Sequence, residues 1–464
     1  MPTNENVQRM RQRVLIANRG EIAIRAIRAC QSLGLESVAV YSTADQSAPH
    51  AWLADQAYCI GPPASRQSYL KMDALLHVAR ETQCTLVYPG YGFLAENAEF
   101  AERCEKADMV FVGPSPECIR TMGDKARART TAVQFGVPVV PGSAGTFVDA
   151  NEAIDAADEI GYPLLLKASA GGGGRGMRVV GYAAEFAGLF NQASQEAGEA
   201  FGDPAVYLER YFPSVRHIEV QVFGDSHGNV RQLGERDCTT QRRHQKLVEE
   251  SPSPVLSAAE RTALLDAAEK LAIGVGYQGA GTVEFIFDEH SRQFFFIEMN
   301  TRIQVEHPVT EICIGHDLIV EQFRVALGEP LSIADEAVWP GGHAIEFRIN
   351  AEDAWRDFQP SPGRVHEWRL PRGSGIRVDS FVYEGIDVQP FYDSMIAKLI
   401  VHGVDREAAL ACARDALDRF EISGPATLKP FHRALVDDPD FRSNKIHTRW
   451  VESTFLGRLS KEDS

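Results

Sequence analysis

Two glutamates and an asparagine interrupt an apolar, aromatic pair of predicted strands over residues 281–300. If the turn between the strands is residues 289–293, Glu284 lies directly opposite Glu298, and Asn300 points the same way as Glu298. Like charges that face each other destabilise a sheet, and a divalent cation between them removes the repulsion. Two carboxylates and an amide oxygen suit Mg²⁺ or Mn²⁺, with phosphate oxygens completing the coordination. The alternative, a solvated face of an edge strand, agrees less well with the buried character of this hairpin.

Three more polar residues follow Asn300 at alternate positions: Arg302, Gln304 and Glu306. If the extended run continues, they share one face with the candidate metal ligands. A row of polar side chains is difficult to bury, and the floor of an active site accounts for it. We therefore predict that Glu306 acts as a general base and that Arg302 holds a small anion.

Four consecutive glycines, residues 171–174, lie between two apolar stretches, and Lys167 ends the first stretch. The run is no P-loop, because no G-K-[ST] sequence opens a helix after it. It predicts the tip of a β-hairpin that presents backbone N–H groups to phosphate oxygens, with Lys167 as a nearby cation. A flexible surface loop is the common alternative for such a segment. The candidate metal site favours the phosphate interpretation.

A third cluster is the run ERDCTTQRRHQKLVEE, residues 235–250, in which five basic side chains stand among acids and amides. A solvated, charged helix is the usual explanation of such a run. That explanation leaves His217 and the basic cluster without a role. Together with the candidate metal pair, a pocket for phosphates and anions is the stronger interpretation.

Composition excludes several classes of function. The chain has 464 residues and a net charge of −17, which argues against a nucleic-acid partner held by phosphate contacts. Its eight cysteines include no C-x-x-C pair, so reduced thiols in a cytoplasmic protein are expected. No apolar run reaches the roughly 20 residues that span a bilayer, and no signal peptide is recognisable at the N-terminus. We expect no membrane partner.

The first part of the chain alternates predicted strands with predicted helices, as in an open parallel α/β sheet. Strands are expected at 13–18, 36–42, 85–90 and 109–113, and helices at 21–34, 68–81 and 98–107. The first turn has a single glycine, so the fold is Rossmann-like without a dinucleotide fingerprint.

A Pro/Gly-rich joint at residues 135–145 ends this pattern. We predict a Rossmann-like domain with a linker helix over 1–139, a small glycine-rich unit over 140–213, and a C-terminal domain over 214–464. Longer alternating strands at 216–225, 281–287 and 293–300 predict an antiparallel sheet in the last part. The fold class is therefore mixed, α/β followed by α+β.

Long motifs then connect the chain to a known family. They include IANRGEIAIRAIRA, YPGYGFLAENAEFA, KASAGGGGRGMRVV, ERDCTTQRRHQK, FIEMNTRIQVEHPVTE, RINAED and FYDSMIAKLI. Over essentially its whole length the chain resembles biotin carboxylase, a member of the ATP-grasp superfamily. The resemblance implies an ATP-grasp fold in which the glycine-rich unit is a closing lid that excludes water.

The resemblance also implies a reaction. ATP phosphorylates bicarbonate to carboxyphosphate, which breaks down to CO₂ and phosphate, and the phosphate helps to deprotonate biotin N1′, which attacks CO₂. Glu284, Glu298 and Asn300 would hold two divalent metal ions, Mg²⁺ or Mn²⁺. Bicarbonate would be held by Lys246, Arg302, Gln304 and Val305, with Glu306 as its base. Arg348 would stabilise the biotin enolate. ATP would be bound by Lys125, Lys167, Gly173, Gly174, Glu209, Arg210, Tyr211, Phe212, His217, Gln241, His244, Glu284 and Ile446.

The chain contains no Met-Lys-Met biotinylation signature, so biotin is expected on a separate carrier protein. The resemblance implies biotin carboxyl carrier and carboxyltransferase partners and a homodimer. The default acceptor is acetyl-CoA, as in fatty-acid synthesis, with propionyl-CoA, other acyl-CoAs or pyruvate as alternatives.

Two other functions are possible from the motifs: a carboxylate–amine ligase of the same superfamily, and a regulatory protein that has lost catalysis. The presence of Lys246, Arg302, Glu306 and Arg348 argues against the second.

Overall fold

The computed structural model describes residues 12–168, 177–333 and 341–462. The chain divides into two compact units. Unit 1 comprises Met1–Val137, Arg216–Phe285 and Glu298–Ser464, and unit 2 comprises Pro138–Val215 and Ile286–Ile297. In the described residues no helix is both long and apolar enough to cross a membrane. The eight cysteines, all of which are described, are free thiols.

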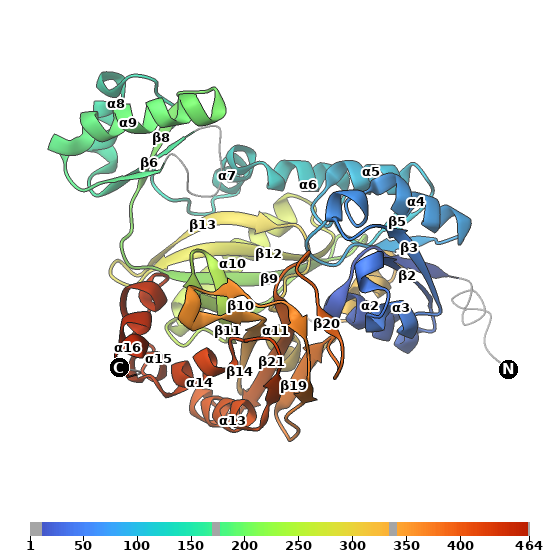
Figure 1. Ribbon diagram of the computed structural model, residues 1–464. Helices are drawn as coiled ribbons and strands as arrows, with labels where there is room; N and C mark the ends of the chain where they lie inside the picture. The colour runs from blue at the N-terminus through green and yellow to red at the C-terminus, as the bar shows by residue number, and fades with distance from the viewer. Residues whose placement is uncertain (1–11, 169–176, 334–340, 463–464) are drawn as a thin grey trace. The chain divides into compact units, whose positions relative to one another are not determined.

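A five-stranded parallel sheet opens unit 1, as the strand–helix alternation predicts (Figure 1). In the order β3-β2-β1-β4-β5, its strands are β1 (Arg13–Ile16), β2 (Glu36–Ser42), β3 (Gln56–Gly61), β4 (Leu86–Tyr88) and β5 (Val110–Phe111). β1 pairs in parallel with β2 and with β4. The strands nearest the middle are almost entirely buried, because helices cover both faces of such a sheet.

The helices of this region largely follow the predicted pattern. α2 (Gly20–Leu33) ends where Gly34 takes the left-handed conformation, with φ of 68°. The other helices are α3 (Pro49–Leu53), α4 (Met72–Glu81), α5 (Ala98–Glu105), α6 (Pro116–Gly123) and α7 (Lys125–Gln134). α3 and β3 were not predicted, and α4 begins four residues later than expected. Tyr69 explains the late start, because it is buried in a turn and donates a hydrogen bond to Asp45.

Unit 2 contains a three-stranded antiparallel sheet in the order β7-β6-β8. Its elements are α8 (Ala150–Ile160), β6 (Leu164–Ala168), β7 (Arg178–Val180), α9 (Ala183–Phe201) and β8 (Val206–Arg210). Leu164 pairs with Val180 and Leu166 with Arg178, so β6 and β7 form the predicted hairpin. The glycine run at its tip, including Gly173 and Gly174, lies outside the described residues.

An eight-stranded sheet carries seven of the predicted site residues, among them Lys246, Glu284 and Arg348. Its order is β13-β12-β9-β10-β11-β14-β21-β19. The strands are β9 (Arg216–Gly224), β10 (Val230–Arg242), β11 (Gln245–Ser251), β12 (Gly279–Asp288), β13 (Gln293–Asn300), β14 (His343–Asn350), β19 (Ile376–Ser380) and β21 (Met395–Gly403). From β9 to β19 each neighbouring pair is antiparallel, as predicted.

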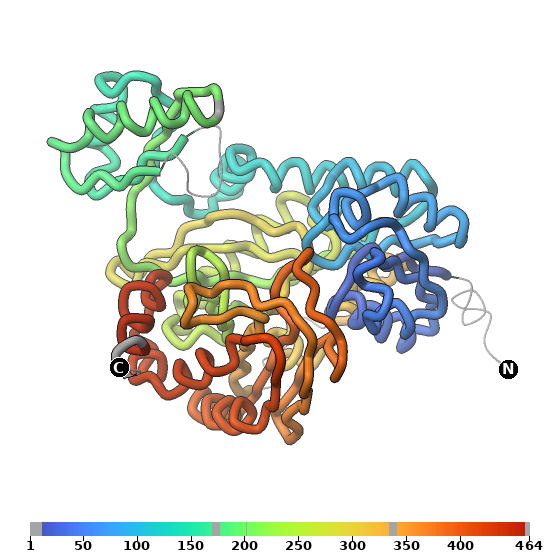
Figure 2. The backbone as a smooth tube through the Cα atoms, viewed as in Figure 1, coloured from blue at the N-terminus to red at the C-terminus, as the bar shows by residue number. Residues whose placement is uncertain are grey.

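Further helices and small strand pairs belong to the same part of the chain. The helices are α10 (Ala258–Gly274), α11 (His307–Ile314), α12 (Leu318–Ala326), α13 (Arg406–Arg419), α14 (Lys429–Asp437), α15 (Pro439–Arg442) and α16 (Leu456–Glu462). The short strands are β15 (Glu352–Asp353), β16 (Gln359–Pro360), β17 (Gly363–Arg364), β18 (Glu367–Arg369), β20 (Asp387–Val388) and β22 (Glu421–Ser423). α13 packs on β14 and β21. The red C-terminal segment in Figure 2 returns to the start of β9, where Arg216 donates a hydrogen bond to Asn444.

Two local predictions about the site region were wrong. The turn after β12 comprises the four residues 289–292, because β13 already begins at Gln293. The extended run ends at Asn300, and residues 301–306 form bends and turns that lead into α11. The alternative explanation of the basic run 235–250, a solvated charged helix, does not hold. The run forms parts of β10 and β11, joined by a tight turn in which Arg243 and His244 have φ of 48° and 65°.

Candidate active site

Lys246 lies at the centre of a cluster of acids and amides in unit 1. Its Nζ is 2.6 Å from Glu306 Oε1, 3.0 Å from Glu284 Oε1 and 3.0 Å from Gln304 Oε1, and it also donates to Glu219. Burial works against the charged lysine, but Glu219, Glu284 and Glu306 outweigh it and raise the pKa of Lys246 well above its usual value. The ammonium group therefore stays charged and holds three carboxylates together.

Glu306 immediately precedes α11, and both of its carboxylate oxygens bind cations. Oε1 accepts from Lys246, and Oε2 accepts from Arg348 Nη2 at 3.0 Å. Burial raises the pKa of Glu306, but the charges of Lys246 and Arg348 outweigh burial and hold the pKa well below its usual range. The carboxylate is thus ionised and can accept a proton once an anionic substrate draws the cations away from it.

Glu284 of β12 accepts hydrogen bonds from three sides. Its Oε1 accepts from Lys246 Nζ, from Asn300 Nδ2 at 2.9 Å and from Gln304 Nε2 at 2.9 Å. Residues 284, 300 and 304 therefore converge as predicted, although the turn and the end of the strand differ from the prediction. β13 allows this because Phe295 and Phe296 are both buried, which interrupts the alternation of the strand.

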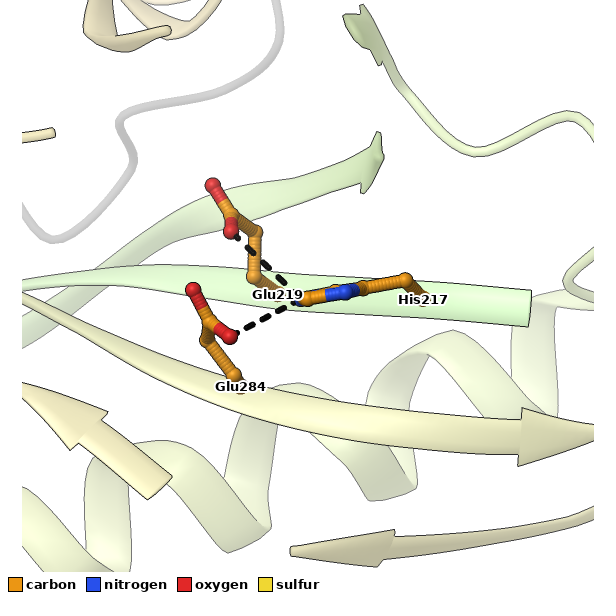
Figure 3. A group of neighbouring side chains, drawn as sticks. All are labelled: His217, Glu219 and Glu284. Carbon is orange, nitrogen blue, oxygen red and sulfur yellow. Dashed lines mark ion pairs between the residues drawn. The ribbon is translucent and has the colours of Figure 1, made fainter. Parts of the chain in front are cut away.

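Figure 3 shows His217, Glu219 and Glu284 pointing toward one another from β9 and β12. His217 Nε2 lies 3.0 Å from Glu284 Oε2 and 4.0 Å from Glu219 Oε2. Burial, the largest effect, lowers the pKa of His217, but the interactions with Glu284 and Glu219 together outweigh it, and the pKa is raised overall. Glu219 was not predicted, although it lies two residues after His217 and so on the same face of the strand. Arg236, its partner in the pairing of β9 with β10, donates to Glu219 Oε1 at 2.6 Å.

The predicted metal ligands have oxygen donors suited to a hard divalent cation. Burial raises the pKa of Glu284, but Lys246 and His217 hold it well below its usual range, so this carboxylate is ionised. Asn300 contacts Glu284 directly, and its Oδ1 accepts from Arg302 Nη2 at 3.1 Å. Glu298 has 36% of its side chain exposed, and its Oε2 is 3.5 Å from Lys125 Nζ. Two carboxylates and an amide oxygen fit Mg²⁺ or Mn²⁺.

Arg302 connects the polar cluster to Glu96, in the segment that precedes α5. Its Nε donates to Oε2 of Glu96 at 2.9 Å, and Glu96 also accepts from the backbone N–H of Thr301. Glu96 was not predicted. Nothing local in the sequence marks it, since more than two hundred positions separate it from Arg302.

Arg348 of β14 lies between two carboxylates. Its Nε donates to Oε1 of Glu249 at 2.6 Å, and its Nη2 donates to Glu306. Its ion-pair partners are thus glutamates distant in the sequence, rather than the acids of the adjacent RINAED segment. Next to it, Lys398 donates from Nζ to the backbone oxygen of Val305 at 2.8 Å.

The remaining predicted residues of unit 1 are less closely associated with Lys246. Gln241 is paired with Lys246 across β10 and β11, and its Nε2 donates to the backbone oxygen of Cys238 at 3.2 Å. His244 is exposed in the tight turn. Ile446 is buried in the apolar core formed by β14, β21 and the C-terminal helices.

In unit 2 the structure brings Lys167 and Glu209 together as a hydrogen-bonded ion pair across β6 and β8. Arg210 Nη1 donates to the backbone oxygen of Ile160 at 2.8 Å. The N–H of Tyr211 donates to the backbone oxygen of Pro163 at 3.0 Å. Phe212 stacks on Phe295, with 5.2 Å between the ring centroids.

Comparisons with known proteins agree with this geometry. Three family models match: biotin carboxylase, N-terminal domain, over residues 10–119; carbamoyl-phosphate synthase L chain, ATP binding domain, over 124–334; and biotin carboxylase C-terminal domain, over 346–453. Biotin carboxylase 1 of Bacillus subtilis is 52% identical over 444 residues, which cover 96% of this chain and 99% of that protein. A pyruvate carboxylase subunit of Methanothermobacter thermautotrophicus is 49% identical over 460 residues, with coverage of 98% and 93%.

Solved structures give the same result. A biotin carboxylase–βγ-ATP complex from Campylobacter jejuni has a TM-score of 0.88 and 46% identity, covering 95% of this chain and 98% of that one. The biotin carboxylase domain dimer of Hydrogenobacter thermophilus 2-oxoglutarate carboxylase, in complex with MgADP, ADP and bicarbonate, has a TM-score of 0.87 and 47% identity, with coverage of 95% and 97%. The fold and these matches define an ATP-dependent carboxylase of the ATP-grasp type. The chain belongs to the biotin carboxylase family.

Proposed function

We propose that this chain carboxylates biotin on a separate carrier protein with ATP and bicarbonate, as the first half-reaction of acetyl-CoA carboxylase. One observation carries the proposal: Lys246 and Arg348 bind opposite oxygens of the buried Glu306 carboxylate. A base held between two cations, which are themselves suited to bind an anion, is the arrangement needed to deprotonate bicarbonate.

Bicarbonate would be held by Lys246, Arg302, Gln304 and the backbone of Val305. When the anion binds, Lys246 and Arg302 exchange part of their contacts with protein carboxylates for contacts with the substrate. The pKa of Glu306 then rises toward its usual value, and Glu306 accepts the bicarbonate proton. The deprotonated oxygen attacks the terminal phosphorus of ATP, and the bond from that phosphorus to ADP breaks.

The metal ions would be held by Glu284, Glu298 and Asn300, whose oxygen donors fit Mg²⁺ or Mn²⁺. Bound metal neutralises phosphate charge during phosphoryl transfer. For the ATP itself we propose the residues predicted by the resemblance, with Lys125, His217, Gln241, His244 and Ile446 in unit 1. In unit 2 they are Lys167, Gly173, Gly174, Glu209, Arg210, Tyr211 and Phe212.

In the second step Arg348 would stabilise the negative charge that develops on the ureido oxygen of biotin as N1′ loses its proton. Phosphate released from carboxyphosphate would accept that proton, and N1′ would then attack CO₂. The guanidinium is preorganised for this role, because Glu249 holds its Nε while Nη2 faces the cluster around Glu306.

We further propose a homodimer that works in the cytoplasm with a biotin carboxyl carrier protein and a carboxyltransferase. The three-part division at 1–139, 140–213 and 214–464 is our proposal for its domains. Pyruvate is the second candidate acceptor, because a protein named as part of a pyruvate carboxylase is 49% identical to this chain. Assays of the reconstituted complex with acetyl-CoA, propionyl-CoA and pyruvate would separate the acceptors.

The central test is ATP hydrolysis with Mg²⁺, measured with and without bicarbonate and free biotin. A slow ATPase that depends on bicarbonate and is stimulated further by free biotin supports the proposal, and a carboxylate–amine ligase would show neither effect. Glu306→Gln should lose both the bicarbonate-dependent ATPase and biotin carboxylation, since Glu306 acts on bicarbonate. Glu421→Gln, an exposed position, serves as the control and should retain both. Full ATPase activity in Glu306→Gln would contradict the assigned base.

A further inference from the structure

Two buried glutamates face each other beside Arg348. In the antiparallel pairing of β11 with β14, Glu249 is directly opposite Glu346, and each residue is 0% exposed. Directly opposite residues of antiparallel strands point to the same face, with Cβ atoms about 4.5–5.5 Å apart. The two carboxyl groups therefore share one face of the sheet, away from water, where like charges repel most strongly.

The hydrogen bonds of the two glutamates are unequal. Glu249 Oε1 accepts from Arg348 Nε at 2.6 Å. Among the described residues, Glu249 Oε2 and both oxygens of Glu346 have no hydrogen-bond partner. Buried carboxylates without donors are strongly unfavourable, whereas a protonated carboxyl group donates a hydrogen bond to a neighbouring carboxylate. One proton between the two groups would remove the repulsion and supply the missing donor.

The charged groups around this pair do not neutralise a second negative charge. Lys398, which lies opposite Arg348 in the pairing of β14 with β21, is already bound to Glu21 at 3.0 Å and to the backbone oxygen of Val305. The other ionisable side chains that act on the pair are Arg348 of β14, Lys246 of β11, Glu306 before α11 and Tyr91 in the segment after β4. Burial raises the pKa of both carboxyl groups, and these neighbours only partly oppose it.

We propose that Glu249 and Glu346 hold a single proton between them and act as positioning residues for Arg348. The proposal rests on the proposed role of Arg348 toward biotin. With one proton, the pair carries one negative charge, which anchors Arg348 through Nε and leaves Nη2 directed at Glu306. With no proton, the second charge would compete for the guanidinium and draw it away from the developing charge on biotin. With two protons, Arg348 would lose its anion.

The proton can be observed directly, without any activity measurement. Infrared difference spectra of the full chain near neutral pH should contain the C=O band of a protonated carboxyl group. Glu346→Gln should remove that band while the protein stays folded, because glutamine has the shape of protonated glutamate. The matched control is Glu250→Gln, at the next position of β11. Glu250 is ion-paired with His343 and Arg406, and its pKa is lowered to about 2, so this variant should keep the band. An unchanged band in Glu346→Gln would overturn the proposal.

The pH dependence tests the positioning role. In the unsubstituted protein, kcat/KM for biotin should fall once the pH rises through the pKa of the pair, while the biotin-independent ATPase falls less. In Glu346→Gln the glutamine has no acidic proton to lose, so the fall of kcat/KM for biotin should move to higher pH. Glu249→Gln should lower kcat/KM for biotin about tenfold or more at every pH, since Arg348 loses its anchor. A pH profile of Glu346→Gln that coincides with the unsubstituted profile would refute the role. If biotin carboxylation is absent altogether, the proposed function fails, and the infrared band still decides the shared proton.

Discussion

Arg348 Nη2 lies 3.0 Å from Oε2 of Glu306, and the other oxygen of the same carboxylate accepts a hydrogen bond from Lys246. The group proposed to contact biotin and the group proposed to deprotonate bicarbonate are thus in direct contact. Bicarbonate activation and biotin carboxylation thus depend on one network of charged residues. The effect of a substitution in this network must therefore be measured on each step separately.

Arg348→Ala should lower the rate of biotin carboxylation by roughly 10²–10³, the usual cost of removing a group that stabilises developing negative charge. The slow bicarbonate-dependent ATPase without biotin should persist, because carboxyphosphate forms before biotin reacts. Both rates should be measured on protein whose melting temperature has been checked. Arg406→Ala is a suitable control, since it removes another half-buried arginine paired with a glutamate, Glu250. If both activities of Arg348→Ala fell together, its role would be structural.

Lys246→Met should destabilise the fold by about 3–5 kcal/mol, because three buried carboxylates lose their common cation. The loss should shrink on acidification, since protonation of the carboxyl groups relieves the repulsion. A second substitution, Glu219→Gln, should recover part of the melting temperature without restoring activity. Urea unfolding of the single and double variants at two pH values measures the effect. Equal stability of Lys246→Met and the unsubstituted protein would mean that Lys246 does not hold these acids together.

Glu298→Gln should raise the Mg²⁺ concentration needed for half-maximal ATPase by roughly tenfold or more. Removing even a residue that only hydrogen-bonds a metal ligand typically lowers metal affinity by about that factor. Without metal the melting temperature should change little, because Glu298 is part-exposed and its ion pair with Lys125 contributes little to the free energy of unfolding. Glu289→Gln, in the turn of the same hairpin, is the control. An unchanged Mg²⁺ titration for Glu298→Gln would remove Glu298 from the metal site.

Two buried histidines should make the protein sensitive to acid. Burial lowers the pKa of His50 and of His432 to about 4, below the usual 6.5. Since the unfolded chain binds the protons first, stability is present above pH 6.5 and is lost as pH falls toward 4, by up to roughly 3 kcal/mol for each histidine. His50→Gln should therefore show a smaller fall in melting temperature between pH 7 and 5. The exposed His366→Gln should behave as the unsubstituted protein. Parallel pH curves for all three would contradict the neutral, buried state of His50.

Much of the site was predictable from local pattern alone. The acids and amides of residues 284–306 stand out because they interrupt apolar strands, and a strand places alternate residues on one face. A pocket that combines them with the basic run was expected from charge, and the family resemblance placed Lys246 in it; Glu284, Gln304 and Glu306 do contact Lys246. The parallel sheet at the start of the chain was also predictable from local pattern. Short apolar runs typical of buried strands alternate there with segments whose apolar residues have helical spacing.

Local sequence pattern did not show which distant residues pair with each other, or where the alternation of a strand is interrupted. The pairing of β10 with β11 has Thr240 opposite Val248 and Gln241 opposite Lys246, so Leu247 is an extra residue in β11. Because such a bulge shifts the alternation by one, it lets both Lys246 and Glu249 reach the cluster around Glu306, although they are three positions apart. Glu96 and Glu249 meet their arginines across long stretches of chain. Short-range sequence determined which residues are polar, apolar or able to turn, whereas the register of distant strands, and with it every ion pair of the site, was decided by packing of the whole sheet.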